Sequence, residues 1–319
     1  MSMIAPTTAE APLRSPAEAQ HRAVILFAYI GLLVSIPIYG FWQAFVPGAP
    51  AWMLGAQLGI LLALLALTFI WKMVRPLRGF FLIMLVINFI SLVLNPLVKG
   101  SALWTGWFGT NNTSYFVANF SELLWKLLVT LIVIGVLLAM GLQRRDFFLV
   151  KGQLDAPAKR IRWLPGMKEN DTWMQFGRGF AIITFLLLLS GTLLINLPRL
   201  GVDNLIKAIP LFPAALLFAA MNAIYEEMVF RAAPLSQLVN VVGSRHALLM
   251  TVVYFGLGHF VGSVPSGAVG VALAAFFAYV LGKAMLETKG IVWPWICHFA
   301  ADAAVFIFIA VSVTAAGTV

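Results

Sequence analysis

Charge is scarce in this sequence of 319 residues, because only 10% of its residues are charged. Soluble globular proteins carry about 25%. Together with 61% hydrophobic residues and a mean hydropathy of +0.95, this shortage excludes a soluble globular domain and a disordered chain. It also argues against a nucleic-acid-binding protein, despite a net charge of +9. The only cysteine, Cys297, excludes an internal disulfide and a cysteine-rich zinc site.

The sequence instead contains long runs of apolar residues. A membrane core about 30 Å thick is crossed by about 20 apolar residues of helix. Runs of this kind lie at 23–42, 51–71, 79–98, 127–143, 179–198, 208–225, 245–262, 266–286 and 290–315. The sequence therefore predicts an all-α, polytopic transmembrane helical bundle with about nine helices, or eight if one early helix lies flat on the membrane.

The distribution of Lys and Arg predicts the orientation of the bundle, because these residues concentrate on the cytoplasmic side of membranes. With a cytoplasmic N-terminus, the outer segments keep only Lys99, Arg199 and Lys207, and Lys126 lies near the outer end of its helix. No cleavable signal peptide or organelle signal is evident. We therefore expect an integral protein of a bacterial inner membrane.

A long basic loop divides the chain. We predict a disordered cytoplasmic tail at 1–22, a four-helix membrane region at 23–143, a basic cytoplasmic loop at 144–178, and the membrane domain that carries the chemistry at 179–319. The loop is interpreted as a segment lying against anionic headgroups, in preference to a partner site. If a partner protein docks, we expect it to use residues 23–178.

Ionisable side chains inside a membrane are costly, so each is a functional candidate. In the predicted spans they all fall in the last third of the chain: Glu226, Glu227, Arg231, His259, His298 and Asp302.

The first motif is EExxxR at residues 226–231. Residues four apart share a helix face, which predicts an ion pair between Glu227 and Arg231. Glu226 is turned about 100° away. It is therefore expected to remain an unpaired carboxylate, as suits a general base. The alternative is a purely structural cluster of all three residues.

The second motif is FxxxH, from Phe255 to His259. A lone histidine on an apolar helix is either a packing residue or a catalyst. If the chain turns near Val242–Gly243, Glu226 and His259 are equally far from the turn and lie at the same depth in the membrane.

The third motif is HxxxD, in which His298 and Asp302 share one helix face. Such a pair can orient an imidazole, relay protons or form half of a metal site. Taken together, the motifs supply a base and oxyanion donors, as peptide hydrolysis requires. Other intramembrane protease designs are excluded, because the sequence has no H-E-x-x-H, no G-x-S-G and only one aspartate in a span.

EExxxR, FxxxH and HxxxD, in this order, resemble the CAAX-protease and bacteriocin-processing (Abi) family of glutamate-dependent intramembrane endopeptidases. The resemblance covers roughly residues 179–315. It implies that Glu226 and His259 activate water and that His298 and Asp302 stabilise the oxyanion. The supporting residues it implies are Glu227, Arg231 and Phe255.

Asp302 departs from the pattern of the eukaryotic members, which carry an asparagine there. An amide can donate to an oxyanion, whereas an ionised aspartate repels one. Asp302 is therefore either protonated or orients His298.

We expect no cofactor. Zinc is the alternative, because Glu226, His259, His298 and Asp302 offer enough nitrogen and oxygen ligands. However, few neighbouring groups would orient the two histidines as ligands. The expected substrate is a peptide or membrane protein in the lipid bilayer. Two other functions compete: a non-catalytic immunity or binding protein, and an ion-coupled transporter, against which the lack of an internal repeat counts.

Overall fold

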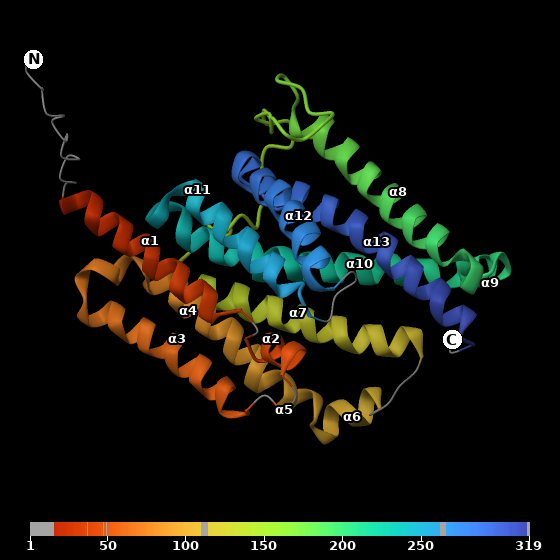
Figure 1. The fold of residues 1–319 in the computed structure, drawn as a ribbon, viewed down its shortest axis with the longest axis horizontal. Helices are drawn as coiled ribbons and strands as arrows, with labels where there is room; N and C mark the ends of the chain where they lie inside the picture. The colour runs from red at the N-terminus through yellow and green to blue at the C-terminus, as the bar shows by residue number, and fades with distance from the viewer. Residues whose placement is uncertain are drawn as a thin grey trace, which may run out of the picture.

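The computed structural model describes residues 16–36, 38–46, 48, 50–109, 114–261 and 266–317. In these residues the chain is a bundle of long helices, so the predicted fold class is confirmed (Figure 1). No strand is present in the described ranges; a single isolated β-bridge joins Pro157 and Thr172.

The first half of the chain forms the following helices: α1 (Pro16–Val34), α2 (Ile38–Phe45), α3 (Trp52–Ile70), the 3₁₀-helix η1 (Lys72–Leu77), α4 (Arg78–Phe89), the π-helix η2 (Ile90–Leu94), α5 (Asn95–Lys99), α6 (Ala102–Phe108) and α7 (Tyr115–Ala139). The predicted tail at 1–22 is too long, because α1 begins at Pro16, a residue suited to the first helical turn. Residues 1–15 lie outside the described residues.

The second half forms the remaining helices: α8 (Trp173–Leu200), α9 (Val202–Ala208), the 3₁₀-helix η3 (Ile209–Leu211), α10 (Phe212–Glu226), the π-helix η4 (Glu227–Ala232), α11 (Ala233–Gly258), α12 (Gly267–Thr288) and α13 (Val292–Ala315). Among them, α10 lies between α7 and α13, and α11 packs against α12 (Figure 1).

Seven helices in the described residues are long and apolar enough to cross a membrane, or eight if the bent pair Gln20–Val34 and Ile38–Phe45 forms one span. The prediction of about nine, or eight, counts 208–225 and 245–262 as two helices, whereas they fall in one continuous helical run, Val202–Gly258, of 57 residues. At 1.5 Å per residue a straight run would be about 85 Å long, far more than one crossing needs.

This run folds back on itself at Gly243. Gly243 has φ +81° and ψ 155°, a conformation that residues with a Cβ rarely adopt. On either side of it, the ring of Phe230 lies 5.2 Å from that of Tyr254 and 5.8 Å from that of Phe255. The predicted turn near Val242–Gly243 is confirmed, and it makes the two arms antiparallel neighbours.

Helix α7 begins earlier than the sequence suggests. The apolar run 127–143, with its extension back to Leu123, predicts a later start, whereas the helix begins at Tyr115 and ends at Ala139. Polar residues in its first turns have local partners: the Asn119 side chain donates to the Tyr115 carbonyl at 2.7 Å, and Glu122 pairs with Lys99. Lys126 therefore lies near the middle of the helix and not near its end.

The basic loop predicted at 144–178 is shorter and is anchored to the protein. Helix α8 starts at Trp173, after a capping box made by Thr172 and Gln175. The loop hydrogen-bonds to the ends of α12 and α13: Gln153 N donates to Thr288 O at 2.7 Å, and Trp293 Nε1 donates to Leu154 O at 2.8 Å. It is thus held by α12 and α13, and does not rest on headgroups alone.

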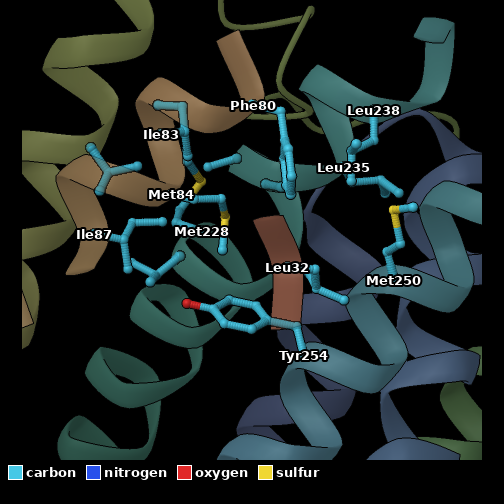
Figure 2. Packing of buried hydrophobic residues seen from close by; sticks show 14 of the residues in the cluster. Leu32, Phe80, Ile83, Met84, Ile87, Met228, Leu235, Leu238, Met250 and Tyr254 are labelled. Carbon is cyan, nitrogen blue, oxygen red and sulfur yellow. The ribbon is translucent and has the colours of Figure 1, made fainter. Parts of the chain in front are cut away.

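The largest cluster of buried side chains joins the two halves of the chain. Figure 2 shows Leu32 from α1 and Met84 from α4 in one cluster with Met228 from η4 and Met250 from α11. Van der Waals packing of this kind is a main source of helix association in membranes. Because Met228 follows Glu227, the cluster also holds the backbone of the EExxxR motif in place.

Candidate active site

The EExxxR motif lies where an α-helix widens into a π-helix. Helix α10 ends at Glu226, η4 covers Glu227–Ala232, and Pro234 follows at the start of α11. Proline has no N–H to continue the α-helical pattern, which accounts for the wider turn before it. The other π-helix, η2, likewise precedes a proline, Pro96. Single-turn π segments are frequent at functional sites.

One carboxylate oxygen of Glu227 contacts two side chains, the guanidinium of Arg231 and the imidazole of His298. Oε1 of Glu227 accepts from Arg231 Nη1 and from His298 Nδ1, the latter at 2.6 Å. The predicted Glu227–Arg231 pair is confirmed, and both side chains are almost fully buried. Since a carboxylate only accepts, Nδ1 carries the hydrogen, and Glu227 thereby fixes the ring of His298.

Glu226 is not the unpaired carboxylate that the sequence predicts. Its Oε1 lies 3.0 Å from Asn222 Nδ2 and 3.7 Å from Lys126 Nζ, and its Oε2 lies 3.3 Å from His298 Nε2. The prediction was wrong because it considered only neighbours on the same helix, whereas Lys126 comes from α7 and His298 from α13. The Lys126 ammonium offsets part of the cost of burying the Glu226 carboxylate.

Asp302 faces the same amide as Glu226. Its Oδ2 accepts from Asn222 Nδ2 at 3.0 Å, and its Oδ1 lies 3.9 Å from His298 Nε2. The sequence left two alternatives for Asp302: it is protonated, or it orients His298. The second role belongs chiefly to Glu227, which is closer to the ring and contacts its other nitrogen, Nδ1. Asp302 instead helps to fix Asn222.

His259 lies just beyond α11, which ends at Gly258, and not inside a helix as predicted. Its Nδ1 lies 2.8 Å from the carbonyl oxygen of Phe255. Since a carbonyl only accepts, Nδ1 donates, and in the neutral form of the ring Nε2 holds the lone pair. The Phe255 ring lies 4.3 Å from the His259 ring and 5.7 Å from the His298 ring. His259 also interacts electrostatically with Glu226.

Sequence reasoning missed two residues of this cluster, Asn222 and Lys126. Lys126 Nζ donates to Asn222 Oδ1 at 2.6 Å, and the amide nitrogen of Asn222 contacts both Glu226 and Asp302. Asn222 precedes Glu226 by four residues, so the two share a helix face, and this spacing could have predicted their contact. Lys126 was overlooked because its helix was expected to begin almost at that residue.

Hydrogen bonds and ion pairs connect the clustered side chains, although in the described residues Glu227 Oε2 and Arg231 Nε and Nη2 are buried without a hydrogen-bond partner. Among the described residues, no group of three or more His, Cys, Asp or Glu side chains is arranged to hold a metal ion. The arrangement presents a carboxylate, Glu226, next to an imidazole nitrogen, Nε2 of His298. Chemically, such a pair can accept a proton from water and stabilise a developing negative charge.

Residues 208–304 match the family described as Type II CAAX prenyl endopeptidase Rce1-like. The matched range contains EExxxR, FxxxH and HxxxD, so the resemblance inferred from these motifs is confirmed for this part of the chain. No curated protein and no solved structure matches the chain. The chain is thus an integral membrane protein with an Rce1-like segment, and Lys126 lies outside the matched residues.

Proposed function

We propose that this protein is a glutamate-dependent intramembrane endopeptidase, which hydrolyses a peptide bond of a peptide or membrane-protein substrate. The observation that carries the proposal is the placement of Glu226 Oε2 at 3.3 Å from His298 Nε2 inside the Rce1-like segment. A base and an oxyanion donor must both reach the scissile carbonyl, so they must lie side by side.

In the proposed reaction, Glu226 takes a proton from water, assisted by the lone pair of His259 Nε2, while the water oxygen bonds to the carbonyl carbon. The carbonyl π electrons move to the oxygen, which accepts a hydrogen bond from the Nε2–H of His298; since Nδ1 already donates to Glu227, the ring acts here as an imidazolium with both nitrogens protonated. When the tetrahedral intermediate collapses, the C–N bond breaks and the leaving amine takes the proton held by Glu226. Asn222 assists by fixing the carboxylate of Glu226. Asp302 assists on the oxyanion side, beside His298.

Differences in exposure support this division of roles. The side chains of Glu226 and Asp302 are 14% and 15% exposed, whereas that of Glu227 is 0% exposed. The carboxylates assigned to chemistry are thus on the accessible side of the cluster. The ion pair assigned to support lies behind them.

The proposal is tested by comparing the membrane proteomes of cells with the wild-type protein and with Glu226→Ala. We expect at least one membrane protein or peptide to persist uncut in the variant. A Glu169→Ala variant, which changes an exposed carboxylate in the loop that precedes α8, should leave that substrate processed. Identical proteomes with wild type and Glu226→Ala would favour a non-catalytic binding protein.

The family's name makes prenylated peptides with a C-terminal CAAX sequence the first synthetic substrates to try. Prenylated and unprenylated forms of the same peptide should be compared. Cleavage of either peptide would show peptide-bond hydrolysis, which we propose. Cleavage of the prenylated peptide alone would show in addition that the prenyl group is required.

Lys126 is proposed to position Glu226. Replacing Lys126 with Met should lower kcat by about ten- to hundredfold, the equivalent of a charged hydrogen bond of ~1.5–3 kcal/mol. KM should change little, since the lysine acts on the base. Lys126→Arg should restore part of kcat, and Lys207→Met, which removes an exposed lysine on α9, should have no effect. A proportional loss of folded protein with unchanged kcat would assign Lys126 a structural role only.

We further propose that hydrolysis needs no metal. Purified protein treated with a strong chelator, and shown by elemental analysis to be metal-free, should retain its cleavage rate. Activity that disappears on chelation and returns with stoichiometric zinc would overturn this proposal and make the clustered side chains zinc ligands.

We propose a bacterial inner membrane location with a cytoplasmic N-terminus. Because Cys297 is buried, a Cys297→Ala background permits labelling of single introduced cysteines. Asp203 in α9 and Ser244 next to the Gly243 turn lie at opposite ends of the first arm of the Val202–Gly258 run. In intact cells, an impermeant maleimide should label Asp203→Cys but not Ser244→Cys. The reverse pattern would invert the orientation.

A further inference from the structure

A second polar site lies away from the candidate active site, where α11 turns at Gly243 and α12 ends. It is a cavity of about 580 Å³ between α11, α12 and the loop that precedes α8. Its polar lining consists of the side chains of Lys159, Ser244, Arg245, Lys283, Glu287 and Lys289, together with Tyr279. No residue of the EExxxR, FxxxH or HxxxD motifs lines it.

The cavity has an excess of positive charge, with four cations against one carboxylate. That carboxylate is already engaged. Oε1 of Glu287 pairs with Lys283, and Oε2 accepts from Trp173 Nε1 at 2.9 Å and from the backbone N of Lys159 at 3.2 Å. In the described residues Glu287 thus forms an ion pair with Lys283 and none with the other three cations.

Three cations remain around the cavity without a counter-charge. In the described part of the chain, the side chains of Lys159, Arg245 and Lys289 form no ion pair. Cations gathered around one cavity repel one another, and a bound anion relieves this repulsion. Arginine and lysine together are well suited to phosphate, since the guanidinium binds two oxygens and the ammonium provides a point charge.

The rest of the lining is apolar and indicates where the anion comes from. Val239, Leu248, Leu249 and Leu286 line the same cavity. Leu249 is 37% exposed, on a helix that crosses the membrane, so the apolar wall adjoins the lipid. A soluble phosphate would leave this wall unused, whereas a phospholipid places its phosphate among the cations and its first acyl carbons against the leucines.

From this geometry we propose that the cavity binds the phosphate headgroup of an anionic phospholipid. Basic pockets between transmembrane helices at the membrane surface are suited to such headgroups. This proposal is independent of the peptidase activity. The inner wall of the cavity adjoins the candidate site, because Gly282, next to Lys283, packs near the Cδ atom of Arg231. A bound lipid would therefore stabilise the part of the fold that holds the Glu227–Arg231 pair.

The test uses the full-length protein purified in a neutral detergent and native mass spectrometry. We expect wild type to retain one phosphatidylglycerol at concentrations at which phosphatidylcholine does not remain bound. Arg245→Gln combined with Lys289→Gln should weaken phosphatidylglycerol retention at least tenfold. Arg162→Gln with Lys168→Gln is the matched control, because it removes two basic residues from outside the cavity lining. This control should retain the lipid.

Three outcomes would overturn the proposal. Equal losses in the two double variants would mean attraction to the basic surface in general. Equal retention of phosphatidylglycerol and phosphatidylcholine would remove the role of charge. Loss of the bound phosphatidylglycerol in millimolar inorganic phosphate, with phosphate binding that depends on Arg245 and Lys289 in the same way, would assign the cavity to a soluble phosphate. A thermal-unfolding measurement on each variant without lipid confirms that the comparison is made between folded proteins.

Discussion

Glu226→Gln should reduce peptide cleavage by about 10²–10⁴-fold, the contribution typical of a positioned general base. Glutamine keeps the size of the side chain and its hydrogen-bonding oxygen toward Asn222, but it cannot take a proton from water. The variant should therefore be folded and inactive. Initial rates on purified protein in lipid vesicles, with a substrate identified from the proteome comparison, provide the measurement.

Glu169→Gln is the matched control for this variant, because Glu169 is exposed and pairs with Arg160 in the loop that precedes α8. Its rate should equal that of wild type. A Glu226→Gln protein that is folded and retains more than a tenth of the wild-type rate would show that another group activates the water.

Glu227→Gln should instead destabilise the protein, by about 3–5 kcal/mol, as expected when one partner of a buried ion pair is removed. Arg231 is fully buried, and in the described residues its Nε and Nη2 have no hydrogen-bond partner. Glu227 therefore supplies its one charged contact. His298 also loses the carboxylate that accepts from its Nδ1. Thermal or denaturant unfolding in detergent measures the loss.

A double variant separates charge from shape in this prediction. Arg231→Met alone should also be destabilising, because it leaves a buried carboxylate. Glu227→Gln with Arg231→Met leaves neither charge uncompensated, and it should be more stable than the sum of the two single losses predicts. Additive losses, or a Glu227→Gln protein as stable as wild type, would contradict the assignment of Glu227 and Arg231 as a buried supporting pair.

The sequence predicted those features that depend on contacts near in the chain. The Glu227–Arg231 pair follows from a spacing of four residues, and it forms even though the segment is the π-helix η4 and not an α-helix. The turn at Gly243 was predictable because it separates two apolar runs, 208–225 and 245–262, each about long enough to cross the membrane. The three motifs also identified the segment that matches the Rce1-like family.

Features that depend on how distant helices pack were not predictable in this way. Lys126 and His298 come to Glu226 from α7 and α13, and no local spacing specifies which helix is the neighbour of α10. The bond from His298 to Glu227, which takes the orienting role considered for Asp302, has the same origin. The early start of α7 was hidden by polar residues whose side chains bond within the helix.

The contact with Lys126 shows that the first half of the chain takes part in the site. Family resemblance is confined to residues 208–304, yet a cation from α7 lies 3.7 Å from the proposed base. The buried cluster that joins α1 and α4 to η4 and α11 holds the two halves in register. The N-terminal helices are therefore part of the structure that positions Glu226.

The central claim is that Glu226 activates a water molecule for attack on a peptide carbonyl. It is tested most directly by cleavage in water enriched in oxygen-18, with mass spectrometry of both products from the earliest time points. Wild-type protein should release a fragment with a single oxygen-18 in its new C-terminal carboxylate, and Glu226→Gln should release this fragment at least about a hundredfold more slowly. Labelled product formed at the same rate by folded Glu226→Gln would contradict the claim.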